Sequence, residues 1–254
     1  MKLPKTPSCR LDGRRALVTG AGRGIGMACA ASLAQAGAEV FLVARHLDEI
    51  SQVAEAISLE GGQAHAFVLD VTSTKDVNLF FEKHDCIDVL VNNAGTNRPK
   101  PFNEVTEDDF DTLFGLNVRA AFFVARAFAI QLINHKRSGS IIQVSSQMGL
   151  VGAANRSLYC ATKHAIEGIT KALAIEFAPH GIRANTLCPT FVDTPLTHEW
   201  LQGDVFRKEV LTKIALGRVG QVEDMMAAVQ FLASDASSLM TGSALVLDGG
   251  WTAA

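Results

Sequence analysis

The stretch RALVTGAGRGIG, residues 15–26, joins an apolar run to a glycine-rich segment. The run at 15–19 has the continuously apolar, β-type character of a buried strand. Helix-forming residues follow at 25–36 and stop at Gly37, which predicts a helix with a glycine at its end. A strand that passes through a glycine-rich turn into a helix is typical of an α/β sheet.

The turn itself predicts a phosphate-binding loop. Gly20, Gly24 and Gly26 allow the backbone to turn tightly and to approach a pyrophosphate closely. The N-terminus of the helix adds N–H donors and the positive end of the helix dipole. An ordinary turn between a strand and a helix is the alternative interpretation, but the order strand, glycines, helix favours a dinucleotide site.

The alternation of strands and helices continues to the end of the chain. Continuous apolar strands separated by helices predict a parallel sheet with both faces covered, in one doubly wound α/β domain over 1–254. The segment at 193–217 fits neither a strand nor a core helix and predicts a substrate lid. Further strands are predicted at 39–44, 64–71, 87–95 (a strand that passes into a loop), 139–146, 182–189 and 243–250, and helices after 44 to about 59, at 107–134, at 157–178 and at 221–234.

Composition excludes several classes of protein. The 254 residues are 48% hydrophobic and 19% charged, which suffices for a large core, and the net charge of −3 does not suit a nucleic-acid binder. Five scattered cysteines without a Cys-x-x-Cys pair predict a reduced, cytoplasmic protein. The N-terminus has no apolar signal region, and no uninterrupted apolar run approaches the ~20 residues that span a bilayer. We therefore expect neither a nucleic-acid nor a membrane partner.

Tyr159, the only tyrosine, lies in LYCATKH, residues 158–164. Lys163 follows four residues later, so both side chains share one face of the predicted helix. A free phenol has a pKa of ~10, and a nearby ammonium group favours the phenolate and lowers that pKa. We therefore expect Tyr159 to exchange a proton with a substrate oxygen. A packed aromatic without chemistry is the alternative.

Three motifs occur in a fixed order: T-G-x-x-x-G-x-G at 19–26, NNAG at 92–95, and Tyr159-x-x-x-Lys163. Together they resemble the short-chain dehydrogenase/reductase family in its form of about 250 residues. The resemblance covers the chain from about 13 to 251. It implies a Rossmann-type domain with a parallel sheet of about seven strands, which interconverts a secondary alcohol and a ketone by hydride transfer with NAD(P)(H).

The resemblance also implies catalytic partners for Tyr159 and Lys163. Ser146, thirteen residues before the tyrosine, matches the serine that bonds the reacting oxygen, and its neighbour Ser145 is the alternative. Asn117 matches the asparagine that holds a helix distortion and a proton-relay water. No metal ligand is assigned.

The second predicted strand ends in Ala44-Arg45, where relatives that use NAD carry an acidic residue. No carboxylate there would repel a 2′-phosphate, and Arg45 and Arg23 could bind one, so NADP(H) is favoured over NAD(H). The resemblance implies the following cofactor-binding residues: Gly20, Arg23, Gly24, Ile25, Gly26, Arg45, Asp70, Val71, Asn93, Ala94, Gly95, Tyr159, Lys163, Pro189, Val192 and Thr194.

The substrate is less well defined by the sequence. Thr190 replaces the family's usual glycine after Pro189 and narrows the pocket, while Phe191, Leu196 and Trp200 are candidates for an apolar lid. A small polar substrate (sugar, sugar acid, polyol or hydroxyketone) is expected. A 3-oxoacyl-[acyl-carrier-protein] reductase and a nonenzymatic NADP-binding regulator are the alternatives. The predicted substrate-binding residues are Arg98, Ser146, Gln147, Asn155, Arg156 and Tyr159.

The helical segment at 118–133 is apolar around most of its circumference, with only Arg119 and Arg126 as a polar stripe. A helix of this kind is buried on a second side. The helix at 157–178 also repeats small apolar residues, and in the family these two helices pack across a two-fold axis. We therefore expect a homo-oligomer, most simply a tetramer.

Overall fold

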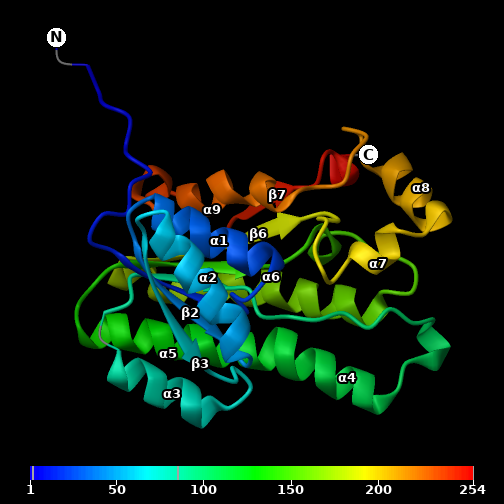
Figure 1. Ribbon diagram of the computed structural model, residues 1–254, viewed down its shortest axis with the longest axis horizontal. Coiled ribbons are helices and arrows are strands. Elements are labelled where there is room, and N and C mark those ends of the chain that lie inside the picture. The colour runs from blue at the N-terminus through cyan, green and yellow to red at the C-terminus, as the bar shows by residue number, and fades with distance from the viewer. Residues whose placement is uncertain (2, 85, 254) are drawn as a thin grey trace.

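The computed structural model describes residues 1, 3–84 and 86–253. These residues form one parallel sheet of seven strands in the order β3-β2-β1-β4-β5-β6-β7 (Figure 1). The fold class is therefore the predicted one. The strands are β1 (Arg15–Thr19), β2 (Glu39–Ala44), β3 (Gln63–Val68), β4 (Val89–Asn92), β5 (Gly139–Val144), β6 (Ile182–Pro189) and β7 (Ala244–Leu247).

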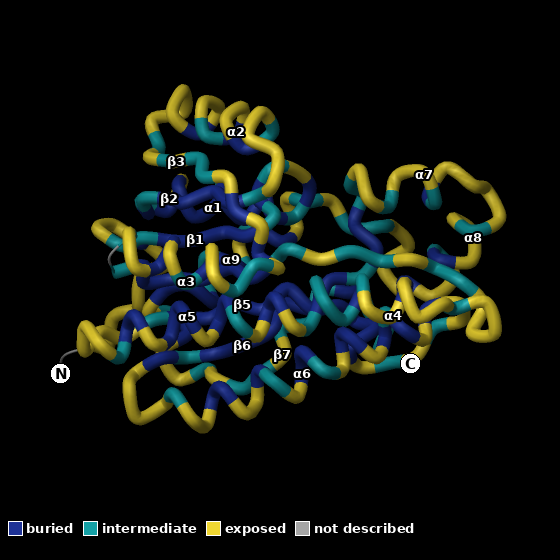
Figure 2. Tube along the Cα trace, turned by 90° about the horizontal axis from the view of Figure 1, so that it is seen from below, coloured by how far each residue is buried: buried dark blue, intermediate teal, exposed yellow. Residues whose placement is uncertain are grey.

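Helices cover both faces of the sheet, and its five inner strands are almost entirely buried, whereas the edge strands β3 and β7 are partly exposed (Figure 2). One core layer packs α1, α2 and α9 against the sheet, and the other packs α3, α5 and α6. The helices are α1 (Gly24–Gln35), α2 (Leu47–Leu59), α3 (Thr74–Lys83), α4 (Glu107–Phe114), α5 (Ala121–Asn134), α6 (Ser157–Phe177), α7 (His198–Leu201), α8 (Asp204–Lys213) and α9 (Met226–Ala233).

The direction of winding reverses at β1. The chain runs outward from β1 through β2 to β3, and then returns to place β4 on the other side of β1. Connections that leave in opposite directions open a crevice at the carboxyl ends of the two central strands. The glycine-rich turn after β1 and the NNAG segment after β4 therefore meet at this edge of the sheet.

Several predicted strands extend too far. Those expected at 64–71, 139–146 and 243–250 end at Val68, Val144 and Leu247, because the residues that follow form loops at the carboxyl edge of the sheet. The segment at 87–95, expected to pass from strand into loop, does so after Asn92. The apolar pattern does not mark these ends, since loop residues that line a cavity are also partly buried.

The single helix expected at 107–134 is interrupted. A π-helical turn over Gly115–Ala120 separates α4 from α5. This helical region, Glu107–Asn134, is long and apolar enough to span a membrane by length and composition, but half of its most apolar 18-residue stretch is buried within the protein. It packs as a core helix against the sheet.

The segment at 193–217 contains α7 and α8, which lie on the side of the molecule where β6 ends (Figure 1). Val210 and Ile214 are buried there against Phe191. The expectation that this stretch suits no packed helix is therefore wrong for α8. Within α8 only Phe206 and Val210 pack in this cluster, with Ile214 just after the helix, and so few apolar residues give no clear periodic pattern.

Gly26 provides a test of the turn that positions the cavity. A Cβ atom there would lie 2.2 Å from the carbonyl oxygen of Gly20 and 2.5 Å from Nδ2 of Asn93. We expect Gly26→Ala to destabilise the protein by about 1–3 kcal/mol, because backbone atoms must move. Thermal unfolding measures this as a Tm lowered by several degrees. Gly152→Ala is the control, since its Cβ would meet nothing within 4 Å. Equal melting of both variants with the wild type would contradict this account.

Candidate active site

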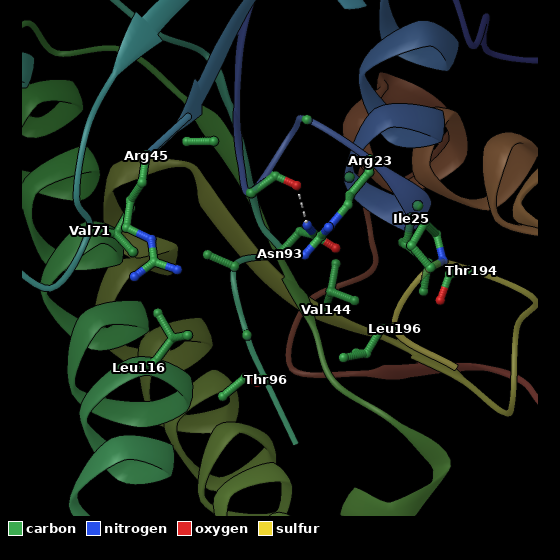
Figure 3. Close-up of a pocket in the computed structure, with 18 of the residues that line it drawn as sticks. Arg23, Ile25, Arg45, Val71, Asn93, Thr96, Leu116, Val144, Thr194 and Leu196 are labelled. Carbon is green, nitrogen blue, oxygen red and sulfur yellow. Dashed lines mark hydrogen bonds between the residues drawn. The ribbon is translucent and has the colours of Figure 1, made fainter. Parts of the chain in front are cut away.

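A cavity of about 550 Å³ runs along the carboxyl edge of the sheet, from the loop after β2 to the loop after β6. All sixteen residues predicted to bind the cofactor line it. In the view of Figure 3, Arg45 and Val71 lie at one end, Ile25 and Thr194 at the other, and Asn93 between them. The structure therefore brings the complete predicted cofactor set to one elongated site.

The glycine-rich turn forms the floor of this cavity. Gly24 has φ +56°, which favours glycine, and a side chain there would press against Thr194. The α1 helix has no side-chain cap and no acidic residue in its first turn, so its N-terminal N–H groups and positive dipole end remain available for an anion. These features fit the pyrophosphate of a dinucleotide.

Hydrogen bonds join this turn to the loop after β4. The Thr19 hydroxyl accepts bonds from the backbone N–H groups of Asn93 (2.9 Å) and Ala94 (3.0 Å). The Asn93 side-chain amide in return donates to the carbonyl oxygens of Thr19 (2.9 Å) and Gly20 (3.1 Å). The two sides of the crevice are therefore fixed relative to each other.

Asp70 and Arg45 lie at the end of the cavity next to β2 and β3. The Asp70 carboxylate accepts hydrogen bonds from the backbone N–H (2.9 Å) and the hydroxyl (2.7 Å) of Thr72, which lower its pKa. Arg45 makes no hydrogen bond or ion pair with any described residue, and its positive charge also lowers the pKa of Asp70. A free guanidinium at this end suits a phosphate group.

The structure adds an acidic group that the sequence interpretation overlooked. Glu49, in the first turn of α2, lines the cavity and lies 3.9 Å from Arg23. Its side chain occupies the space beside Gly22. No carboxylate stands at the end of β2, as expected, but Glu49 brings one to the cavity from the first turn of α2.

Tyr159 and Lys163 lie one turn apart on α6, with the Lys163 Nζ atom 5.5 Å from the centre of the phenol ring. Lys163 is buried and donates a hydrogen bond to the carbonyl oxygen of Val144 (2.8 Å). Burial lowers the pKa of Lys163 to about 8 and raises the pKa of Tyr159 to about 12. The expectation of a lowered tyrosine pKa is therefore wrong, because the cost of burying a phenolate dominates.

Ser146 is the serine that engages the tyrosine. Its hydroxyl accepts a bond from the backbone N–H of Met148 (3.1 Å) and donates one to Oε1 of Gln147 (2.8 Å). Hydrogen bonding with Ser146 also lowers the pKa of Tyr159, against the larger effect of burial. The neighbouring Ser145 hydroxyl is buried without a partner among the described residues.

Asn117 does not line the cavity but lies behind it, in the π-helical turn. Its side chain accepts a bond from the backbone N–H of Thr96 (2.8 Å) and donates to the Thr96 carbonyl oxygen (2.9 Å) and the Thr162 hydroxyl (3.2 Å). Thr162 in turn donates to the carbonyl oxygen of Tyr159 (2.8 Å). Asn117 thus connects the loop after β4 with the helix that bears the tyrosine.

Three supporting residues escaped the sequence interpretation: Thr96, Thr162 and Glu167. Glu167 is buried one turn beyond Lys163, where it accepts bonds from the Thr186 hydroxyl (2.9 Å) and the Cys188 thiol (3.3 Å). Its negative charge raises the pKa of Lys163, against the larger effect of burial. An acidic residue four positions after the lysine is the only sequence signal for it.

The predicted substrate residues divide into two groups. Ser146 and Tyr159 line the cavity, whereas Arg98, Gln147, Asn155 and Arg156 do not. Arg98 pairs with Asp108 (2.7 Å) and Asp109 (3.2 Å), so its charge is already neutralised. Arg156 is buried, and its guanidinium lies 5.0 Å from the centre of the Trp200 ring.

The residues expected in the apolar lid also differ in whether they line the cavity. Leu196 lines the cavity, while Phe191 packs in a buried cluster with Phe206 and Trp251. The Thr190 hydroxyl is buried without a partner among the described residues. The cavity wall after β6 is therefore largely apolar, with single polar atoms exposed to a bound molecule.

Comparison with known proteins agrees with this geometry. A family model described as enoyl-(acyl carrier protein) reductase matches residues 20–252. The chain is 40% identical over 245 residues to an L-xylulose reductase from Bos taurus (96% of this chain, 98% of that one) and 38% identical over 248 residues to a cyclopentanol dehydrogenase from Comamonas testosteroni (96% and 99%). A solved gluconate 5-dehydrogenase from Burkholderia cenocepacia J2315, in complex with NADP and tartrate, superimposes with a TM-score of 0.92 at 37% identity, covering 97% of this chain and 98% of that one. The glycine-rich turn, the seven-stranded sheet, the tyrosine–lysine pair and these matches together show that the chain belongs to the short-chain dehydrogenase/reductase family.

Proposed function

We propose that the protein is a nicotinamide-dependent oxidoreductase that interconverts a secondary alcohol and a ketone on a small polar molecule. The observation that supports this most directly is the tyrosine–lysine pair in a cavity that all the predicted cofactor-binding residues line. The relatives' names, which include a sugar reductase and an alcohol dehydrogenase, agree with this reaction.

A bound nicotinamide supplies or accepts the hydride. The chain's own residues handle the proton and the oxygen. With a pKa near 12, Tyr159 remains protonated at neutral pH, so it is ready to donate to a carbonyl oxygen during reduction. Ser146 can donate a second hydrogen bond to the same oxygen, and protonated Lys163 stabilises the phenolate that forms.

The cofactor is proposed to be NADP(H) in preference to NAD(H). Arg45 has no ionic partner among the described residues and Arg23 is mostly exposed, so both could contact a 2′-phosphate. Glu49 acts in the opposite direction, because its charge already pairs with Arg23 and would repel a phosphate. Arg45 is therefore the residue on which the preference mainly depends.

Two other functions are alternatives to this reaction. A 3-oxoacyl-[acyl-carrier-protein] reductase is favoured by the description of the matching family model. Such an enzyme needs basic residues near the site to dock an acidic carrier, but the outer face of α6 offers Lys171 beside the exposed Ile175. A nonenzymatic NADP-binding regulator has no need of the Ser146, Tyr159 and Lys163 constellation. Turnover of any simple ketone distinguishes the regulator from the enzyme.

The lid, the cytoplasmic location and the oligomer belong to the same proposal. On α5, Phe122 and Ile130 are 41% and 40% exposed and share a face with Arg126. The outer face of α6 presents small residues that allow close approach of a second helix, including Ala161 and Ala172. These two faces favour assembly into a tetramer in the cytoplasm, with α7 and α8 acting as the lid over the substrate.

The proton-donor role of Tyr159 is tested by Tyr159→Phe, which keeps the ring and removes the hydroxyl. We expect kcat to fall roughly 10²- to 10⁴-fold, because general acid–base catalysis contributes that much. Absorbance at 340 nm measures turnover, and cofactor titration and Tm provide the controls for binding and folding. A variant that keeps a tenth of kcat with normal folding would exclude the role.

The cofactor preference is tested by Arg45→Ala combined with Arg23→Ala. We expect KM for NADP(H) to rise at least about tenfold while KM for NAD(H) changes little, because a charge-assisted phosphate contact contributes about 1.5–3 kcal/mol. Arg14→Ala is the matched control, since it removes one arginine at the opposite end of β1. A wild type with the higher kcat/KM for NAD(H) would show the preference to be wrong.

The assembly is tested by light scattering at micromolar concentration. A tetramer is expected, with four times the 27.1 kDa of one chain. Phe122→Glu should reduce the mass, because it places a charge in the proposed apolar contact. A wild-type mass near that of one chain would refute the assembly, and a dimer would refute the tetramer alone.

A further inference from the structure

We propose that Arg156 binds a carboxylate of the substrate, so that the enzyme acts on a small hydroxy acid or its keto acid. This inference deepens the function proposed above and rests on it. It gives one chemical class within the wider range of sugars, polyols and hydroxyketones.

The first support is an unpaired positive charge in the interior. Arg156 is only 8% exposed, yet its guanidinium makes no hydrogen bond and no ion pair with the residues that the structure describes. No acidic side chain contributes to its electrostatic surroundings; burial, Tyr159 and Cys160 dominate them and leave its pKa lowered. A largely buried charge without a partner is costly, and an anionic group of a ligand would offset that cost.

The second support is position. Arg156 is the N-cap residue of α6, three residues before Tyr159. Residues three apart on a helix have Cβ atoms roughly 5–6 Å apart, so the Arg156 side chain begins beside that of Tyr159, next to the cavity that Tyr159 lines. The electrostatic influence of Arg156 on the phenol agrees with this proximity.

The end of α6 adds to the same field. The helix has 21 residues, begins without a side-chain cap, and has no acidic residue in its first turn. Its positive dipole end therefore acts on the space next to Arg156 together with the guanidinium. Both features favour a negative charge there, whereas a neutral polyol would gain from neither.

The Trp200 ring covers one face of the Arg156 guanidinium, with the ring centre 5.0 Å from Cζ. Stacking leaves the edge of the planar group, with its N–H donors, free to bind both oxygens of a carboxylate. Nε2 of the buried Gln147 and the Thr190 hydroxyl also lack partners among the described residues, and both lie in the loops that follow β5 and β6. They could bind substrate hydroxyl groups beside the carboxylate.

The test compares acids with polyols of the same chain length: threonate with threitol, xylonate with xylitol, and gluconate with sorbitol. One of the three pairs will contain the best substrate. Within that pair, we expect kcat/KM of the wild-type enzyme with cofactor to be at least about tenfold higher for the acid than for the polyol. In Arg156→Gln this value should fall roughly 10- to 100-fold, the size of a charge-assisted hydrogen-bond pair, and kcat/KM for an uncharged diketone should fall less, because a diketone has no carboxylate to bind. Arg156→Lys should recover part of the loss. Arg14→Gln, far from the site, controls for the change in net charge.

A second measurement does not need turnover. Calorimetric titration of the cofactor-loaded enzyme with tartrate and with its uncharged analogue threitol should show binding of tartrate alone, at least tenfold weaker in Arg156→Gln. The carboxylate site is overturned if polyols react as well as acids, if Arg156→Gln lowers diketone and acid turnover equally, or if the variant binds tartrate like the wild type. If the wild type turns over none of these substrates but binds tartrate more tightly than Arg156→Gln, the proposed reaction is wrong and the anion site is still supported.

Discussion

The reversal of winding at β1 is the constraint on which the rest of this structure depends. Since β1 pairs with β2 on one side and with β4 on the other, the loops after β1 and β4 leave in different directions and leave a crevice between them. The glycine-rich turn and the NNAG segment belong to these two loops, and their mutual hydrogen bonds through Thr19 and Asn93 fix the width of the crevice. Residues from six strand ends, β1 to β6, then line one cavity although they are far apart in the sequence.

Burial sets the electrostatic state of the catalytic groups more than neighbouring charge does. Tyr159 keeps its proton because a buried phenolate is costly, and Lys163 is held near the point of losing its own proton for the same reason. Glu167 opposes this effect on the lysine from behind the site. The same cost applies to Arg156, where no described side chain compensates it, which distinguishes this arginine from the ion-paired Arg98.

The supporting residues hold these groups in place through hydrogen bonds between elements. Asn117 connects Thr96, in the loop after β4, to Thr162 on α6, and the π-helical turn brings its side chain to that position. Lys163 is anchored to the last residue of β5, Val144. The reacting groups therefore depend on contacts of α6 with the loop after β4, the π-helical turn and the end of β5, and not on the helix alone.

The sequence by itself determined the order of strands and helices, the dinucleotide turn and the tyrosine–lysine pair, because each of these depends on short-range patterns: apolar runs, glycines at turns, and residues four apart on one helix face. Tertiary structure decided what depends on distant parts of the chain. It set the ends of β3 and β5, where residues leave the sheet to line the cavity, and it folded the first turn of α2 back so that Glu49 faces Arg23. It also decided which arginine is neutralised, since Asp108 and Asp109 reach Arg98 and no described acid reaches Arg156. Tertiary structure also decided the pKa values of Tyr159 and Lys163, because burial is a property of the packed molecule and no local spacing in the sequence encodes it.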